Sequence, residues 1–430
     1  MTQVRRSSFR KKSHQIVRKI FGALPAWIKY SIYRSMVDCD PEPDLRLELK
    51  IAESKQELED CFRILHDAYV GSGFMKPDAS GMRITEYHAL PTTTTLCAKY
   101  DGRVVGTISM IREGVFGFPL QAIFDLEAVR TKGGNIAEIS ALAVHPEFRK
   151  TGGAILFPLM KFMHQYCVEY FDTRHLVIAV NPEKIELYEA LLFFERLQEM
   201  PVDRYDFANG APAVGATLDL RSAASVFKAG YKGCVDRKNL HKYFFQTNLK
   251  NIKLPPRRYH TTNDPVMTPE LLNYFFNEKS QLFDSLSDRK KSLLWSIYSM
   301  VEYRRYLPML TGTGQATHPL RKHQRYSIRC PATVKFVDHE GERSFVLHII
   351  EISLSGFQVE SKLELPLDRC GIATINLGVN ECSVVNVTVK RRKITSEGLF
   401  FGFEIQEMDS VWRDCVAALE VGLTSRDLIQ

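Results

Sequence analysis

The chain has 430 residues, of which 45% are hydrophobic and 25% are charged, and its formal net charge is +7. This length predicts two or three domains, and the composition excludes a disordered or fibrous protein. Residues 1–34 contain nine Lys or Arg and no acidic residue, so the rest of the chain is slightly acidic overall. The basicity is therefore local, and we expect neither DNA nor RNA as a partner.

Residues 1–45 form the first predicted segment. Its basic residues alternate with apolar ones, from Phe9 to Ile32, close to helical spacing. A basic amphipathic helix of this kind binds anionic membrane surfaces, or it packs on the body of its own protein, and the sequence allows both. No apolar run reaches the roughly 18–20 residues of a membrane-spanning helix. Charge also interrupts the first apolar cluster too often for a signal peptide.

The nine cysteines are dispersed, and none forms a Cys-x-x-Cys pair. This spacing argues against a zinc ribbon or a redox motif, and no metal site is expected. An odd, scattered set without a secretory signal is typical of reduced thiols in the cytosol. We therefore expect a cytoplasmic protein, peripheral at the inner membrane if the first segment binds lipid.

Strands and helices alternate from residue 46 to about residue 220, which predicts an α/β domain with a mixed sheet flanked by helices. A hairpin over residues 95–111 turns at Asp101 and Gly102. The other predicted strands are 45–53, 138–144, 175–180 and 215–220, and the predicted helices are 55–70, 154–171 and 183–197.

The second half of the chain changes character twice. Residues 221–310 are less regular, with helices predicted at 268–283 and 287–307 behind the caps Thr268 and Ser287, and we assign 46–310 to one domain. Residues 311–319 have the composition of a linker. Residues 320–430 hold only short alternating strands and a closing helix, which predicts an all-β barrel with a C-terminal helix.

A small basic turn follows the strand 138–144 and reads Arg149-Lys150-Thr151-Gly152-Gly153-Ala154. Successive small residues let backbone N–H groups close around a phosphate at a helix N-terminus, although a plain strand-to-helix turn has the same composition. The turn resembles the Arg/Gln-x-x-Gly-x-Gly/Ala loop of the GNAT acyltransferase superfamily. The resemblance implies that these residues hold the pyrophosphate or pantetheine arm of a thioester donor.

The next unit, residues 177–194, resembles the GNAT unit in which an Asn-containing turn leads to a helical Tyr and a final Phe. The resemblance implies that Tyr188 donates a proton to the leaving thiolate; a core tyrosine at a pocket edge is the alternative. The donor arm is then expected to pair with the strand edge from Leu142 to Val144.

Glu138 heads the central strand. When an amine attacks a thioester it loses a proton near the point of attack, and a carboxylate beside the donor turn serves as the base. A structural salt bridge is the alternative. Residues 138–144 also resemble the Glu-x-Ser-Arg strand of the acyl-homoserine-lactone synthases, but Ala141 stands at the Arg position. That departure argues against a lactone synthase that uses S-adenosylmethionine. We expect Glu138 and the basic turn to face one cleft.

Residues 46–310 resemble the long-chain N-acyl amino acid synthases, notably in the stretches YVGSGF at 69–74 and YDGRVVGTISMI at 100–111. The resemblance implies a fatty acyl donor on acyl carrier protein and an amino acid acceptor. An acceptor carboxylate suits an arginine fork, for which Arg83, Arg112 and Arg130 are candidates. The acyl tunnel needs apolar walls, and its candidates are Phe74, Phe116, Phe118, Phe157, Met160 and Met163.

Two groups of residues in the last domain resemble the PilZ signature: Arg321 and Arg325 its Arg-x-x-x-Arg arm, and Glu351, Ser353 and Gly356 its Asp/Asn-x-Ser-x-x-Gly edge. The resemblance extends across 318–425 and implies binding of cyclic di-GMP, whose phosphates and guanines suit guanidinium groups. Glu351 departs from the usual Asp or Asn. A degenerate barrel that no longer binds is the alternative.

The sequence thus predicts an acyltransferase that moves a long-chain acyl group from acyl carrier protein to an amino acid, under control of cyclic di-GMP. No cofactor is expected beyond the donor thioester and this effector. One alternative is a non-catalytic cyclic di-GMP receptor with a degenerate acyltransferase fold. Another is an acetyl-CoA-dependent acetyltransferase of proteins or small amines.

Overall fold

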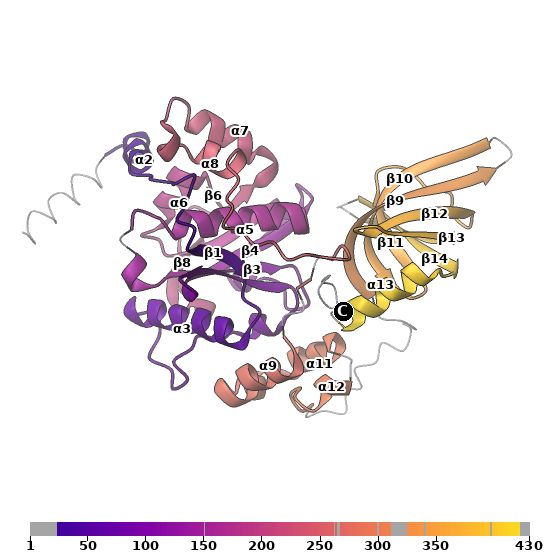
Figure 1. Cartoon of the computed structure of the whole chain (residues 1–430), viewed down its shortest axis with the longest axis horizontal. Helices are drawn as coiled ribbons and strands as arrows, with labels where there is room; N and C mark the ends of the chain where they lie inside the picture. Colours follow the sequence, from indigo (N-terminus) through magenta and orange to yellow (C-terminus); the bar gives the residue numbers. More distant parts are fainter. Residues whose placement is uncertain are drawn as a thin grey trace, which may run out of the picture.

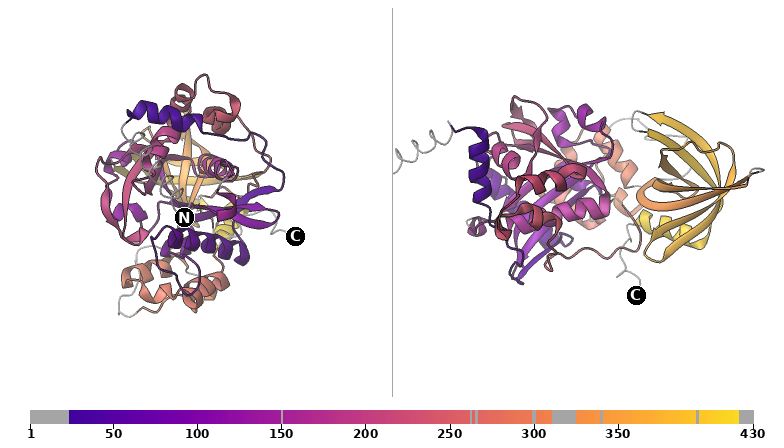
Figure 2. Two further views of the ribbon diagram at one scale, coloured as in Figure 1. Left: turned by 90° about the vertical axis from the view of Figure 1, so that its left-hand side faces the viewer. Right: turned by 90° about the horizontal axis from the view of Figure 1, so that it is seen from above.

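The computed structural model of the chain describes residues 24–149, 151–261, 263–264, 267–298, 301–310, 325–338, 341–395 and 398–421. Figures 1 and 2 show an α/β domain and a closed β-barrel lying side by side. Lys150, Arg321, residues 1–23 and the linker at 311–319 lie outside the described residues.

A mixed sheet forms the centre of the α/β domain. Its strands run in the order β1-β2-β3-β4-β5-β8-β6, and β7 pairs with β8. Neighbouring strands are antiparallel except β4 and β5, which are parallel. The bounds are β1 Leu47–Ile51, β2 Thr93–Tyr100, β3 Arg103–Arg112, β4 Asn135–Val144, β5 Thr173–Val180, β6 Glu195–Arg196, β7 Val202–Tyr205 and β8 Ala211–Asp219.

Helices cover both faces of this sheet (Figure 1). Helix α3 begins at a capping box of Ser54 and Glu57, and its apolar side packs on one face together with residues of the late helices α9 to α11. Helix α5 covers the other face, with α6, α7 and α8 around it. The bounds are α3 Lys55–Gly71, α4 Glu127–Arg130, α5 Leu156–Phe171, α6 Ile185–Leu192, α7 Leu220–Gly230, α8 Leu240–Phe245, α9 Pro269–Asn273, α10 Leu282–Ser285, α11 Asp288–Ile297 and α12 Val301–Arg304.

The predicted mixed α/β fold is confirmed, but several helices differ from the prediction. Helix α6 stops at Leu192 because Phe193 takes a left-handed conformation and the next residues join the sheet as β6. The helix expected at 268–283 is divided by a π-helical stretch, Tyr274–Lys279, and by Gln281 at positive φ. Helices α7 and α8 were not predicted.

The second domain is a closed barrel with strand order β10-β11-β14-β13-β12-β9. Helix α13 (Ser410–Val421) closes it, and the buried Trp412 donates a hydrogen bond to the carbonyl of Ser353 at 3.2 Å. The predicted barrel with a C-terminal helix is confirmed. The strand bounds are β9 Arg325–Asp338, β10 Gly341–Ser353, β11 Gly356–Ser361, β12 Cys370–Gly378, β13 Glu381–Thr395 and β14 Gly398–Glu407.

One short segment contacts both domains. Arg257 is bound within the α/β domain, whereas the buried Tyr259 belongs to the hydrophobic core of the barrel. Between them, Arg258 donates to Glu381 at 2.7 Å, and the N–H of His260 donates to the carbonyl of Leu377 at 2.8 Å. The segment therefore adds a piece of backbone to the edge of the β12–β13 hairpin.

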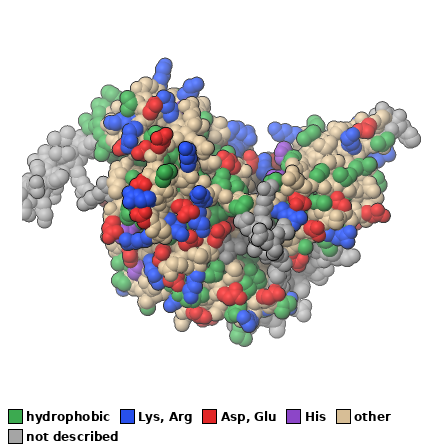
Figure 3. All heavy atoms as spheres, in the orientation of Figure 1, with side chains coloured by type: hydrophobic (Ala, Val, Ile, Leu, Met, Phe, Trp, Pro, Cys, Tyr) green, Lys and Arg blue, Asp and Glu red, His purple; other side chains and the backbone are tan. Residues whose placement is uncertain are grey.

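The described part of the N-terminal segment is helix α2 (Ala26–Ser35), which packs on α6. Lys29 pairs with Glu186 at 2.5 Å, and Arg34 donates to the carbonyl of Ala190 at 2.8 Å. This part of the segment thus packs on the body of its own protein, which is one of the two arrangements that the sequence allowed. Among the described residues, no helix has the length and apolarity to cross a membrane. Figure 3 shows acidic and basic side chains interspersed over one face of the molecule.

Candidate active site

The sheet opens in its middle, between β4 and β5. Their parallel pairing ends at Glu138 and Val177, so the two strands separate beyond this point. On its other edge β4 contains a bulge opposite Ile108, and Ala141 within it has a positive φ of 55°. A bulge leaves an extra residue unpaired and bends the strand. Both features lie at the same place in β4, and together they open a gap in the sheet.

This gap leads into a cavity of about 220 Å³. Residues of β4 and β5 line it from the sheet, among them Leu142, and α5 contributes Met160, Met163 and His164. Helices α6, α7 and α8 complete the wall. Tyr69 of α3, which covers the opposite face of the sheet, is also a lining residue, so the cavity reaches through the gap.

Most of the polar lining of the cavity comes from β4, α6 and the loop between β5 and α6. It includes Ser140, Asn181, Lys184 and Tyr188. Burial raises the pKa of Tyr188, so its phenol is protonated at neutral pH and available as a proton donor. The structure therefore places Tyr188 and Leu142 together in one cavity, whereas Val144 is not among its lining residues.

Glu138 lies elsewhere. Its side chain is 1% exposed, is not a lining residue, and accepts a hydrogen bond from the N–H of Leu120 at 3.0 Å. Burial raises the pKa of this carboxyl to about 8, and the Leu120 N–H only partly opposes that effect. The expectation that Glu138 faces the same cleft as the basic turn is wrong, because side chains alternate along β4 and this position points toward α3.

A cluster of tyrosines surrounds Glu138 on the α3 side. Burial raises the pKa of both Tyr87 and Tyr205, and the charge of Glu138 raises them further, so both rings lie within its electrostatic reach. The hydroxyl of Tyr205 is buried, without a hydrogen-bond partner among the described residues. Tyr69, at the cavity wall, also raises the pKa of Tyr205 by an electrostatic effect. The cluster thus links the carboxyl to the far side of the gap.

Of the three candidate arginines for an acceptor carboxylate, Arg83 belongs to this cluster. It is 5% exposed, stacks on Tyr69 with its guanidinium 4.0 Å from the ring centroid, and donates to the carbonyl of Phe207 at 2.6 Å. No carboxylate lies within ion-pair distance of it among the described residues. A buried guanidinium without a counter-ion suits an anionic ligand.

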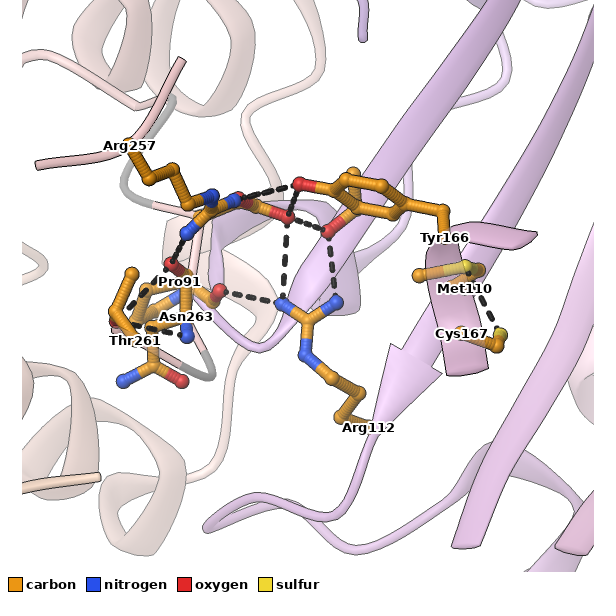
Figure 4. Close-up of polar contacts among 10 residues, drawn as sticks. Pro91, Met110, Arg112, Tyr166, Cys167, Arg257, Thr261 and Asn263 are labelled. Carbon is orange, nitrogen blue, oxygen red and sulfur yellow. Dashed lines mark hydrogen bonds and ion pairs between the residues drawn. The ribbon is translucent and has the colours of Figure 1, made fainter. Parts of the chain in front are cut away.

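The other two arginines are engaged. Arg130 pairs with Glu113 at 2.6 Å. Arg112 donates to Thr94 at 2.8 Å and lies 3.8 Å from the buried carboxylate of Asp264, which Arg257 and Tyr166 also bind (Figure 4). This network fixes the segment after α8, which contains Arg257 and Asp264, to the sheet, so Arg112 has a structural role.

The basic turn lies at the N-terminus of α5 and outside the cavity lining. Gly152 and Gly153 have positive φ, and a Cβ on Gly153 would lie 2.5 Å from the ring of Phe157, so glycine is required there. Arg149 donates to the carbonyl of Val144 at 2.7 Å, and no side chain caps the helix. Thr151 and Ala154 are exposed in the same turn.

Only some of the residues predicted to form the acyl tunnel line the cavity. Met160 and Met163 line the cavity, whereas Phe74, Phe116, Phe118 and Phe157 do not. The sequence prediction missed α7 and α8, which contribute Ala223, Phe227, Phe244 and Phe245. The apolar face of residues 220–230 was the available signal. Among the described residues, no group of His, Cys, Asp or Glu could hold a metal ion.

One end of the barrel holds the described residues of the predicted nucleotide site, which are Arg325, Glu351, Ser353 and Gly356. Arg325, at the start of β9, donates to Glu351 at 2.6 Å, and Ser353 pairs with Arg325 in strand register. Ser353 donates to the carbonyl of Gly356 at 3.1 Å across the β10–β11 turn. A Cβ on Gly356 would lie 2.1 Å from the carbonyl oxygen of Phe403. The space beside Gly356 is thus occupied by the backbone of β14.

Residues 60–219 match the family model described as N-acyl amino acid synthase FeeM. The matched segment is less than half of the chain. The match supports an acyltransferase of the N-acyl amino acid synthase type in this segment. It ends at the last residue of β8, directly before α7. No curated protein matches the chain.

Several solved structures are similar over parts of the chain. FeeM, an N-acyl amino acid synthase from uncultured soil microbes, is 25% identical over 42% of this chain and 93% of its own, with a TM-score of 0.36. The CoA-dependent acyl-homoserine lactone synthase BjaI is 17% identical over 46% and 99%, with a TM-score of 0.32. The inhibitor of motility MotI/DgrA of Bacillus subtilis is 16% identical over 23% and 49%, with a TM-score of 0.20. Scores of this size carry no argument about function.

Proposed function

We propose that the α/β domain moves a long-chain acyl group from a thioester on acyl carrier protein to the amine of an amino acid. The family match over residues 60–219 supports this class of reaction. The observation that carries the proposal is the cavity in the gap between β4 and β5, which has Tyr188 at its polar side and an apolar wall behind.

The donor enters on the α5 face in this proposal. Its phosphate lies at the turn Arg149–Ala154, where the helix N-terminus favours an anion, and its arm passes Leu142 into the gap. The amine nitrogen attacks the thioester carbonyl carbon, the N–C bond forms and the C–S bond breaks. Tyr188 gives its proton to the leaving thiolate and recovers one from solvent.

The acceptor enters on the α3 face, where Glu138 and Arg83 lie. Arg83 binds the acceptor carboxylate, and Glu138 takes the proton of the amine, directly or through water. The two substrates meet through the gap beside Ala141, since Tyr69 on the acceptor side already lines the donor cavity. In this reaction the amine nitrogen must lose a proton and the leaving sulfur must gain one. Glu138 on the α3 face and Tyr188 on the α5 face can serve these two steps.

The barrel is the regulatory part of the proposal. Arg325, Ser353 and Gly356 form its described binding residues for cyclic di-GMP, with Glu351 holding Arg325 when the nucleotide is absent. The segment around Tyr259 joins this barrel to the α/β domain. Binding to an anionic membrane through the N-terminal segment, at the cytoplasmic side of the inner membrane, also belongs to the proposal.

A second candidate is a cyclic di-GMP receptor without catalysis. One observation favours it: the candidate base Glu138 is enclosed and separate from the cavity. Mass spectrometry of lipids from a bacterium with and without the protein tests both candidates. We expect new N-acyl amino acids, and none with Glu138→Gln. If the parent protein adds no such lipid in the bacterium and transfers no acyl group from acyl carrier protein or acetyl-CoA in vitro, the protein is a receptor without catalysis.

A further inference from the structure

We infer that α7 and α8 form the closed end of the acyl site and set the longest chain that the protein accepts. This inference rests on the proposed acyl transfer. It concerns residues 220–245, which lie beyond the family match at 60–219.

The cavity has a polar side and an apolar end. Ser140 lies on β4 and Tyr188 on α6, and Asn181 and Lys184 lie in the loop between β5 and α6. Helices α7 and α8 contribute only apolar side chains. This distribution orients a thioester: its carbonyl belongs near Tyr188, and its hydrocarbon tail extends toward α7 and α8.

The end wall is aromatic, with one small residue in it. Phe227 packs against Phe244 and Phe245 with ring centroids 5.9 and 5.5 Å apart. Ala223, one helical turn before Phe227, is 1% exposed and lines the same wall. A larger side chain at 223 therefore projects into the cavity, and a smaller one at 227 extends it.

The wall is also fixed in place. Asp219 caps α7 by accepting from the N–H of Arg221 at 2.9 Å, and the buried Lys161 of α5 donates to the carbonyl of Phe244 at 3.0 Å. His164 of α5 contacts both phenylalanines of α8, with centroids 5.8 and 5.2 Å from Phe244 and Phe245. Burial lowers the pKa of His164 to about 4, so this end of the cavity carries no imidazolium charge at neutral pH and suits hydrocarbon.

The test compares Ala223→Leu and Phe227→Ala with the parent protein in two assays. The first follows displacement of the fluorescent fatty acid cis-parinaric acid by saturated fatty acids from octanoic to stearic. The second measures kcat/KM for acyl carrier protein charged with the same acyl series. Ala224→Leu is the matched control, because Ala224 is the next residue of α7 and is exposed.

We expect Ala223→Leu to lower kcat/KM about 10-fold or more for the longest chain that the parent accepts, and to leave shorter chains unchanged. Phe227→Ala should move the limit to longer chains, and Ala224→Leu should match the parent. Identical chain-length profiles in the parent, Ala223→Leu and Phe227→Ala would overturn the inference, as would failure of fatty acids to bind the parent. If the binding limits shift but no N-acyl product forms, the site assignment stands and the proposed function fails.

Discussion

Glu138 and Tyr188 lie on opposite faces of the central sheet, with the gap between β4 and β5 separating them. Tyr188 lines the cavity on the α5 face, whereas the carboxyl of Glu138 points toward α3 and binds the N–H of Leu120. The two residues proposed to move protons therefore serve different substrates. Each can be tested separately.

The first prediction concerns the pH dependence of the reaction. Glu138 acts as a base only when it is ionised, and burial raises its pKa to about 8. We expect kcat/KM to rise with pH until about pH 8 and then level off. Glu138→Gln should lower kcat by about 10²–10⁴-fold. A parent profile that is flat between pH 6 and pH 9 would exclude Glu138 as the base.

The same carboxyl makes stability depend on pH. Its pKa is raised in the folded protein above the unfolded value of about 4.3. The folded state therefore favours the protonated form, and stability falls as the pH rises from the unfolded pKa through about 8. Glu138→Gln should raise the free energy of unfolding at pH 9 by about 2–4 kcal/mol, with a smaller effect at pH 5. The exposed Glu199→Gln is the control in urea unfolding, and equal effects of the two changes would contradict the burial argument.

Tyr188→Phe removes the proposed proton donor without changing the ring. We expect kcat to fall by about 10²–10⁴-fold while the binding limits for fatty acids stay the same. An acyl thioester of thiophenol should restore most of the rate, because its thiolate leaves without a proton. If the variant is equally slow with both donors, Tyr188 has a structural role.

Asp264→Asn tests the buried network of Figure 4. Asp264 is the carboxylate between Arg112 and Arg257, and its side chain is 4% exposed. Its loss leaves two buried guanidinium groups without a counter-ion, which should cost about 3–5 kcal/mol of stability in urea unfolding. Asp206→Asn breaks an exposed pair with Arg204 and should have no measurable effect. A similar small effect at both sites would show that the network adds little.

The sequence predicted those features that depend on neighbouring residues. The Asp101-Gly102 hairpin and the helix caps Thr268 and Ser287 follow from local chemistry. The direction of Glu138 and the closing wall of α7 and α8 did not follow. The first depends on the register of β4 in the whole sheet. The second depends on which distant helix, here α5, packs beside residues 220–245.

The last prediction concerns the ion pair between Arg325 and Glu351, whose side-chain atoms lie 2.6 Å apart. Arg325 is the residue proposed to bind the nucleotide, and Glu351 occupies its guanidinium group in this structure. A phosphate of cyclic di-GMP must compete with this carboxylate for the guanidinium group. We expect Arg325→Ala to abolish binding in calorimetry. Glu351→Gln should tighten binding, since it keeps an acceptor at the same length but releases the charge of Arg325. Weaker binding by Glu351→Gln would mean that the carboxylate instead positions Arg325 for the nucleotide, and unchanged binding by Arg325→Ala would remove this end of the barrel as the site.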